Sequence, residues 1–342
     1  MKPFTFVKAP RSARGFTMVE LLISATIMTT LVLLITPLFN VATQGFTSQD
    51  AGLNLKSSSQ NAINHIGNML TESKRLFQNT TNDLNYLNRV QMTGVPPVLS
   101  GSQLPLIEET GSLSPGTTTF TAGSVGNSLF FASFNGPLDL VVTDSTASTS
   151  TIRIDVYHFN YYFLAPDYTK SIAGLAQQDL WEWKSINYAD YDEITAVTDA
   201  TKLTNTVIGI YNSGIQFAWD PSSTTVSSAF YSLNSAGVIT QVPSHQLAQS
   251  SASKLINLTK VTAGGGYRYG VSPNTVGGFT TLKPVPQFGT AVGNFPSGFE
   301  ILVVGPSGAR QVFTRLVVVA QGSFHGTVAV EQISLRNVHD LW

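Results

Sequence analysis

The chain has no cysteine among its 342 residues, so it can form no disulfide and offers no thiolate as nucleophile or metal ligand. Charged residues are also scarce, at 11% of the composition, and the formal net charge at pH 7 is −1. A nucleic-acid footprint requires a basic face, so we expect no nucleic-acid partner. The 42% of hydrophobic residues suffice for one sizeable core, which we expect burial, ladder hydrogen bonds or a metal to stabilise.

One segment lacks ionisable side chains altogether. None occurs between Leu21 and Gln49, and the 22 residues from Leu21 to Ala42 are long enough, at ~1.5 Å per helical residue, to cross a ~30 Å hydrocarbon core. Glu20 directly precedes this run. A carboxylate at the edge of a membrane helix is costly without a partner and marks a functional site by default.

The fifteen residues before Phe16 lack both acidic side chains and an apolar core. They carry four cations, and their removal would change the formal net charge from −1 to −5. An ordinary secretory signal has its apolar segment before the cleavage site, and this chain reverses that order. A cut after Gly15 would give Phe16 a new α-amino group, which is a natural partner for Glu20 at the same depth.

The junction Gly15-Phe16-Thr17-Met18-Val19-Glu20-Leu21-Leu22 resembles the class III signal of the type IV pilins and type II secretion pseudopilins. Counted from Phe16, Glu20 is the fifth residue and Pro37 the twenty-second, where that family has its acidic residue and its helix-kinking proline. The resemblance implies that a prepilin peptidase cuts after Gly15 on the cytoplasmic side and methylates Phe16. It also implies that Glu20 pairs with the Phe16 amine of a neighbouring subunit.

Each of these residues also has an ordinary structural interpretation. Glu20 fits an interfacial acid that reaches toward water, Pro37 a kink that membrane helices tolerate, and Gly15 a linker glycine. A plain signal anchor requires neither a glycine before the cut nor a buried acid, so their joint spacing favours the pilin-type interpretation. We therefore expect a cleaved leader at 1–15, a transmembrane and assembly helix at 16–50, and a β-rich periplasmic or extracellular domain at 51–342.

Apolar residues continue at helical spacing beyond the membrane segment, which predicts a helix from near Phe16 to about Gln78 with an amphipathic second half. We expect the stripe to face the core of the domain, the alternative being a partner surface. It comprises Ala62, Ile63, Ile66, Met69, Leu70 and Phe77.

The segment 79–127 is rich in Asn, Thr, Gly, Ser and Pro and predicts a long irregular connection. The fold class is therefore α+β and pilin-like, with one long N-terminal helix packed on antiparallel sheets. Strands are predicted at 128–134, 138–143, 151–164, 178–187, 207–211, 215–219, 229–233, 255–261, 299–304, 312–320 and 327–337.

The mature chain of 327 residues is longer than a typical major pilin, which favours a minor subunit. Four downstream segments loosely resemble the minor pseudopilin J and minor pilin W families. The resemblance implies a membrane-anchored structural component that joins other minor and major subunits at a filament tip, together with an inner-membrane assembly platform. The four segments are Tyr161–Leu164, Leu180–Lys184, Gly214–Trp219 and Ile333–Asn337.

Catalytic chemistry finds no support in the sequence, so we expect no enzyme and no cofactor. The five histidines stand apart, with no ligand pair at i,i+4 and no neighbouring nucleophile; they are His65, His158, His245, His325 and His339. Asp190-Tyr191-Asp192-Glu193 is either a solvated acidic turn or, less in keeping with its pattern, a calcium loop. The alternative function is a pilus-tip adhesin or binding module with its ligand face in 79–127, or a minor pilin of DNA uptake.

Overall fold

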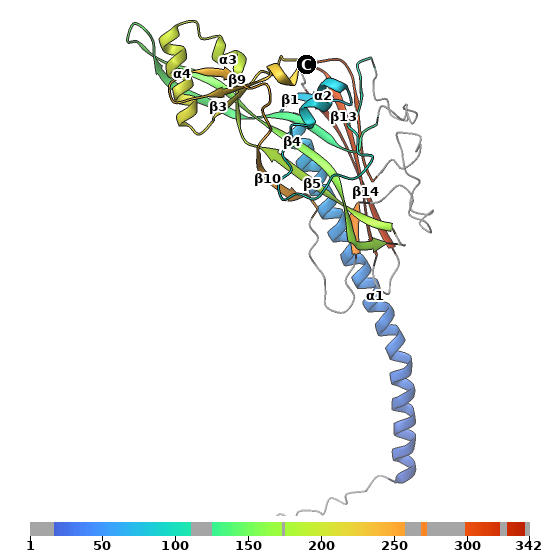
Figure 1. Cartoon of the computed structure of the whole chain (residues 1–342). Helices are drawn as coiled ribbons and strands as arrows, with labels where there is room; N and C mark the ends of the chain where they lie inside the picture. Colours follow the sequence, from blue (N-terminus) through green and yellow to red (C-terminus); the bar gives the residue numbers. More distant parts are fainter. Residues whose placement is uncertain are drawn as a thin grey trace, which may run out of the picture. The chain divides into compact units, whose positions relative to one another are not determined.

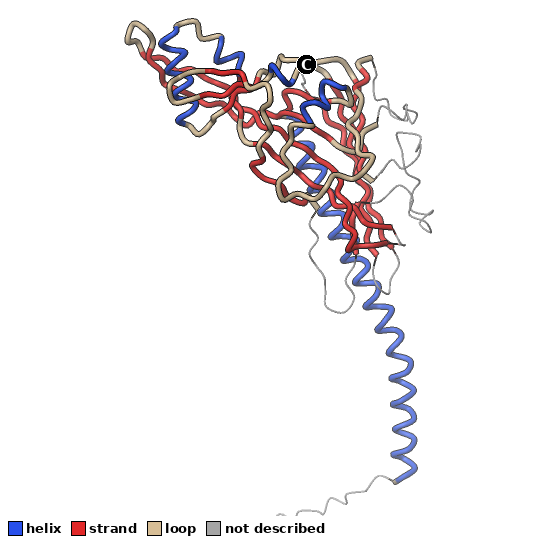
Figure 2. The backbone as a smooth tube through the Cα atoms, viewed as in Figure 1, coloured by secondary structure: helices blue, strands red, loops and turns tan. Residues whose placement is uncertain are grey.

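The computed structural model describes residues 17–110, 125–172, 175–256, 268–271, 298–321 and 327–338. By its internal contacts the chain divides into two units, Met1–Asp50 and Ala51–Trp342. Figure 1 shows the elements along the chain, and Figure 2 shows the strands of the second unit together with its helices and loops. Helix and sheet together confirm the predicted α+β class.

Helix α1 (Met18–Thr71) is continuous through Pro37 and ends before the predicted Gln78. Strand β1 (Ser73–Phe77) follows it and pairs antiparallel with β3. The predicted end was wrong because Phe77 happens to continue the apolar spacing of the helix. In the structure Phe77 lies on β1 and belongs to a separate aromatic cluster on the sheet. Tertiary pairing therefore decides where the helix ends.

Long antiparallel strands form the centre of the second unit. Strand β3 (Leu129–Thr143) pairs with β4 (Thr149–Ile172), which pairs in turn with β5 (Leu175–Ser185). Two strands predicted at 128–134 and 138–143 are thus one strand, whose register shifts at the positive-φ residue Gly136 (φ 108°). Glycine suits this bulge because it adopts positive φ without a Cβ clash.

Further strands extend the sheet on both sides. On one side, β5 pairs with β10 and β11, and β11 leads through β13 to β12 and β14. On the other side, β4 leads through β6 and β7 to β8 and β9. The bounds are β2 (Ile107–Glu108), β6 (Tyr188–Asp190), β7 (Phe217–Trp219), β8 (Phe230–Leu233), β9 (Ile239–Gln241), β10 (Gln249–Lys254), β11 (Arg268–Val271), β12 (Phe299–Val304), β13 (Arg310–Gln321) and β14 (Thr327–Val338).

The sheet is mixed, which corrects the prediction of purely antiparallel sheets. Strand β2 pairs parallel with β12, and β6 pairs parallel with β7. Parallel neighbours require a crossover connection, and helices α3 (Tyr191–Thr195) and α4 (Ala200–Asn212) supply it between β6 and β7.

Helix α4 replaces the strand predicted at 207–211. Asp199 caps it by accepting a hydrogen bond from the Lys202 N–H at 2.7 Å, and Val207 and Ile210 are buried on its inner side. Periodicity cannot distinguish a short apolar run in a buried helix from a strand, which explains the error. Other differences are smaller. Helix α2 (Thr81–Leu87) interrupts the predicted irregular connection, and a short 3₁₀ turn spans Val226–Ser228. Of the strand predicted at 255–261, the structure describes only residues 255 and 256, which follow the end of β10.

The sheet carries a core on each face. On one face, the second half of α1 buries Ile63, Ile66 and Leu70 against β3, β4, β5, β12 and β13, as predicted for the inner side of the stripe. The opposite face carries an aromatic cluster that includes Phe77 and Trp219 and is covered by α2 and the following segment. A third core packs α3 and α4 on the far part of the sheet.

Candidate functional site

Helix α1 begins with a reciprocal cap between Thr17 and Glu20. The Thr17 backbone N–H and hydroxyl donate to Glu20 Oε2 at 2.9 and 3.0 Å, and the Glu20 N–H donates to Thr17 Oγ1 at 3.3 Å. This is the capping box of a Thr-x-x-Glu sequence, in which the side chain of each residue accepts a hydrogen bond from the backbone N–H of the other. The pattern was present in the sequence, but the prediction considered Glu20 for pairing between subunits or as an interfacial acid, and not as a cap.

The first part of α1 is suited to membrane anchoring. Met18–Thr43 is a stretch of 26 residues that contains an 18-residue window of mean hydropathy 2.2, and none of that window is buried inside the structure. Its threonine hydroxyls donate to backbone carbonyls four residues earlier, for example Thr29 to Ala25 at 2.7 Å and Thr36 to Val32 at 2.6 Å. Hydroxyls paired in this way place no unsatisfied donor in lipid, so the threonines are compatible with a membrane span.

Pro37 lies inside this span. Because proline has no N–H, the carbonyl of Leu33 loses its usual helical donor. Gly15 and Phe16, the predicted cleavage pair, lie outside the described residues. Of the four predicted processing and assembly residues, the structure therefore describes Glu20 and Pro37, both on α1.

Past Ala51, a polar contact connects α1 with the sheet. Glu182 on β5 is 8% exposed, and its Oε1 lies 2.6 Å from His65 Nε2 on α1, 2.7 Å from the Tyr162 hydroxyl and 3.4 Å from Lys184 Nζ. Burial opposes ionisation, but the hydrogen bonds from His65 and Tyr162 outweigh it and lower the pKa of Glu182. Burial and this carboxylate together raise the pKa of Tyr162 well above its ordinary range.

Sequence analysis missed this contact because its partners are far apart in the chain. An available signal was Glu182 itself, a charged residue between the two tryptophans Trp181 and Trp183. Buried carboxylates are normally paired, so its position called for a cationic or hydroxyl partner.

The described histidines occupy structural positions. Burial lowers the pKa of both His158 and His245 to about 4, so both are neutral at pH 7. Contrary to the prediction, His158 does have a serine beside it: its Nε2 lies 3.2 Å from Ser133 Oγ. Ser133 is fully buried and accepts a hydrogen bond from Asn160 at 2.7 Å, so this pair belongs to the interior packing. His325 and His339 lie outside the described residues.

The acidic segment beginning at Asp190 opens a helix. Asp190 caps α3 by accepting hydrogen bonds from the N–H groups of Asp192 and Glu193, and the Glu193 carboxylate accepts from the Asp155 N–H at 2.6 Å. Within the described residues, no group of three acidic or histidine side chains has a metal-binding arrangement. These carboxylates therefore stabilise the β6–α3 junction.

Comparison with protein families agrees with the start of α1. The family model for the prokaryotic N-terminal methylation motif matches residues 10–36, which include Gly15, Phe16 and Glu20. Searches among curated proteins and solved structures gave no significant match. The chain therefore carries a type IV pilin-like N-terminal signal followed by an apolar helix.

Proposed function

We propose that the chain is a structural minor subunit of a pilin-like filament, and not an enzyme. The observation that carries this proposal is the methylation motif over residues 10–36, which covers the capped start of α1 and most of the exposed apolar span Met18–Thr43. A methylation signal of this kind is typical of proteins that leave the membrane as filament subunits. The filament is a type II secretion pseudopilus or a type IV pilus.

Processing and orientation follow from the same segment. The leader 1–15 carries four cations and remains on the cytoplasmic side of the inner membrane. Prepilin peptidase cuts after Gly15 and methylates the new N-terminus of Phe16. The helix 16–50 then holds the subunit in the membrane, while the domain 51–342 lies in the periplasm and later on the filament.

In assembly, Glu20 pairs with the Phe16 amine of a neighbouring subunit, and Pro37 shapes the helix for packing among other helices. An ion pair between these groups is strong because the dielectric constant of the membrane is low. The other subunits and an inner-membrane assembly platform are the partners.

The length of the mature chain and four downstream segments support a minor subunit of the J or W type. Tyr161–Leu164 lies in β4, Leu180–Lys184 in β5, the end of Gly214–Trp219 in β7 and Ile333–Asn337 in β14. In this role the protein joins other minor subunits at the filament tip and primes growth.

The proposal is tested with Glu20→Gln, which keeps the size of the side chain and removes its charge. We expect normal insertion, normal cleavage and a folded outer domain, with at least a tenfold loss of incorporation into filaments. Thr17→Val is the matched control: it removes the capping hydroxyl but leaves the carboxylate for the neighbour.

The readouts are N-terminal mass spectrometry, crosslinking between membrane helices, and filament yield. Wild-type levels of crosslinking and filaments with Glu20→Gln would show that Glu20 only caps α1. Equal losses with Thr17→Val and Glu20→Gln would likewise assign the effect to the cap and contradict pairing.

A further inference from the structure

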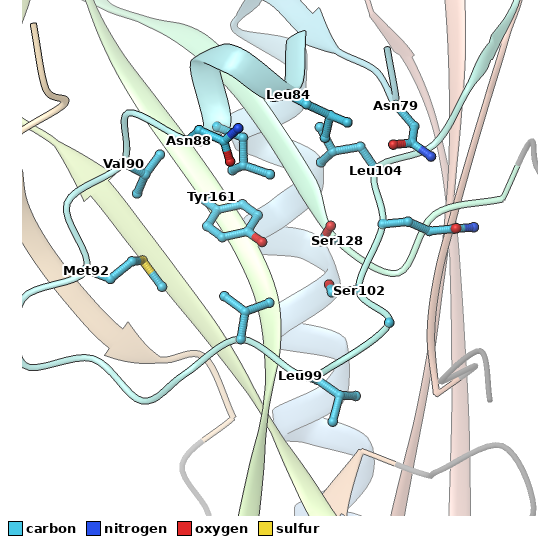
Figure 3. A pocket seen from close by; sticks show the side chains of 14 residues that line it. Asn79, Leu84, Asn88, Val90, Met92, Leu99, Ser102, Leu104, Ser128 and Tyr161 are labelled. Atoms are coloured by element: carbon cyan, nitrogen blue, oxygen red, sulfur yellow. The ribbon is translucent and has the colours of Figure 1, made fainter. Parts of the chain in front are cut away.

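A pocket of about 420 Å³ lies on the face of the sheet opposite α1. Its walls come from α2, from the irregular segment that follows it, from Ser128 directly before β3, and from Tyr161 on β4 (Figure 3). Every lining residue belongs to the described part of the chain. The volume falls within the roughly 300–1,000 Å³ range of small-molecule sites.

Fixed backbone contacts hold the pocket open. The Gln91 N–H donates to the Leu247 carbonyl at 3.1 Å, and the Leu99 N–H donates to the Leu164 carbonyl at 2.8 Å, so both ends of the overlying segment are attached to the sheet side. Further along the same segment, the Gln103 side chain is held in place because its Nε2 donates to the Val125 carbonyl at 2.7 Å. The segment therefore spans the pocket without filling it.

The lining is uncharged. Seven of the lining residues are leucine, valine or methionine, and none is acidic or basic. Burial raises the pKa of Tyr161, the one phenol, to about 12, so its hydroxyl stays protonated. A charged ligand would lose its hydration here without gaining a counter-charge, whereas an uncharged apolar group would not.

A buried hydroxyl group at this pocket is poorly paired. Ser128 is 1% exposed, and within the described part of the chain its Oγ makes no hydrogen bond of good geometry, although the Tyr161 hydroxyl lies near it. Figure 3 shows the hydroxyls of Ser128, Ser102 and Tyr161 gathered in one region of the pocket, with Met92, Val90 and Leu99 around them. Buried polar groups are normally satisfied, so an unpaired hydroxyl beside a cavity indicates a missing partner.

We propose that this pocket binds a small uncharged molecule with an apolar body and one hydroxyl or carbonyl group. The apolar body packs against the leucine, valine and methionine side chains. The polar end hydrogen-bonds to Ser128 Oγ and the neighbouring hydroxyls. This site does not depend on the assembly role and would give the exported domain a binding function as well.

The absence of cysteine allows a site-specific test in the full chain, held in phospholipid nanodiscs. Ser102→Cys places one thiol in the pocket wall, and Ser232→Cys on β8 is the matched control. Both serines are half-buried and each donates one hydrogen bond of 3.3 Å. The measured quantity is the rate of reaction with an uncharged methanethiosulfonate reagent.

The probes are cyclohexanol and benzyl alcohol, compared with cyclohexanecarboxylate and benzylammonium. We expect the two alcohols to slow labelling of Ser102→Cys about tenfold at ten times their dissociation constant, and to leave Ser232→Cys unchanged. The two ions should slow neither. Unchanged labelling with both alcohols would overturn the proposal and leave water as the occupant. Equal protection by the ions would overturn the preference for an uncharged ligand.

Two further substitutions keep the proposal testable. Val98→Phe, made at a half-exposed lining position, fills the pocket and should abolish protection while the unfolding temperature stays unchanged. Ser128→Ala should weaken alcohol binding roughly three- to tenfold, the effect of one hydrogen bond. Should Ser102→Cys fail to fold, Val98→Cys serves as the reporter. Unchanged affinity for the alcohols in Ser128→Ala would contradict the role of that hydroxyl.

Discussion

Loss of the Glu182 carboxylate should destabilise the exported domain, because it would leave the Tyr162 hydroxyl buried without an acceptor. Tyr162 is fully buried, so we expect a cost of about 1–3 kcal/mol for its hydroxyl. The His65 side chain is 36% exposed and can turn to water, so its loss adds at most about 1 kcal/mol. The expected decrease in the free energy of unfolding for Glu182→Ala is therefore about 1–4 kcal/mol.

Glu182→Gln separates charge from hydrogen bonding. The amide oxygen still accepts from Tyr162 and His65, so we expect a cost of about 1 kcal/mol at pH 7. The pKa of Glu182 is lower in the folded protein than its ordinary value of 4.5, so its ionisation stabilises the fold above about pH 4.5. That contribution is lost as the pH falls through the folded-state pKa, and the difference between wild type and Glu182→Gln should disappear below it.

The assay is urea unfolding of the fragment Ala51–Trp342, followed by tryptophan fluorescence between pH 3 and 7. Other carboxylates titrate in both proteins and cancel in the difference. Asp139→Ala on β3 is the control, because that side chain is exposed, and should cost less than about 0.5 kcal/mol. The reasoning is refuted if Glu182→Ala costs no more than this control, or if the difference between wild type and Glu182→Gln does not change with pH.

Three further predictions concern other parts of the chain. Mass spectrometry of the membrane-extracted protein should find a methylated N-terminal Phe16, and recovery of an intact leader ending at Gly15 in peptidase-competent cells would contradict it. The fragment Ala51–Trp342 should be soluble, unfold cooperatively and ignore reductant, whereas a molten state would show that its core needs the preceding helix. Arg75→Met should lower the free energy of unfolding by roughly 3–5 kcal/mol, because it leaves the buried Asp83 carboxylate without its cation. Arg75 is itself buried, donates to two backbone carbonyls and pairs with Asp83 at 3.2 Å. A decrease below about 1 kcal/mol would refute this prediction.

Elements with a strong local pattern were predictable from the sequence. The apolar half of α1 needed only a count of residues without charge, and β12 has the predicted bounds 299–304. Helical spacing of Ile63, Ile66 and Leu70 predicted which side of the second half of α1 is buried. In these segments, periodicity and propensity agree with the tertiary structure.

The errors occurred where distant contacts decide the outcome. Residues 207–211 form part of α4 because Asp199 caps a helix whose apolar side packs on the sheet. The end of α1 depends on the pairing of β1 with β3, and the contact of His65 with Glu182 joins residues 117 positions apart. Local spacing carries no information about such partners, so the sequence could indicate that Glu182 needs a partner but could identify neither that partner nor the pocket beside Tyr161.

The geometry at Glu20 allows the cap and the proposed pairing to coexist. Both hydrogen bonds from Thr17 use Oε2, and no described residue binds Oε1. The cap therefore orients the carboxylate on the first turn of α1 while it leaves one oxygen for the amine of a neighbour. In Glu20→Gln, an amide oxygen that keeps the cap would turn the NH₂ group toward the incoming amine, and two donors cannot pair. The substitution should thus preserve the helix start and oppose assembly, which is why insertion and folding are expected to survive while incorporation is lost.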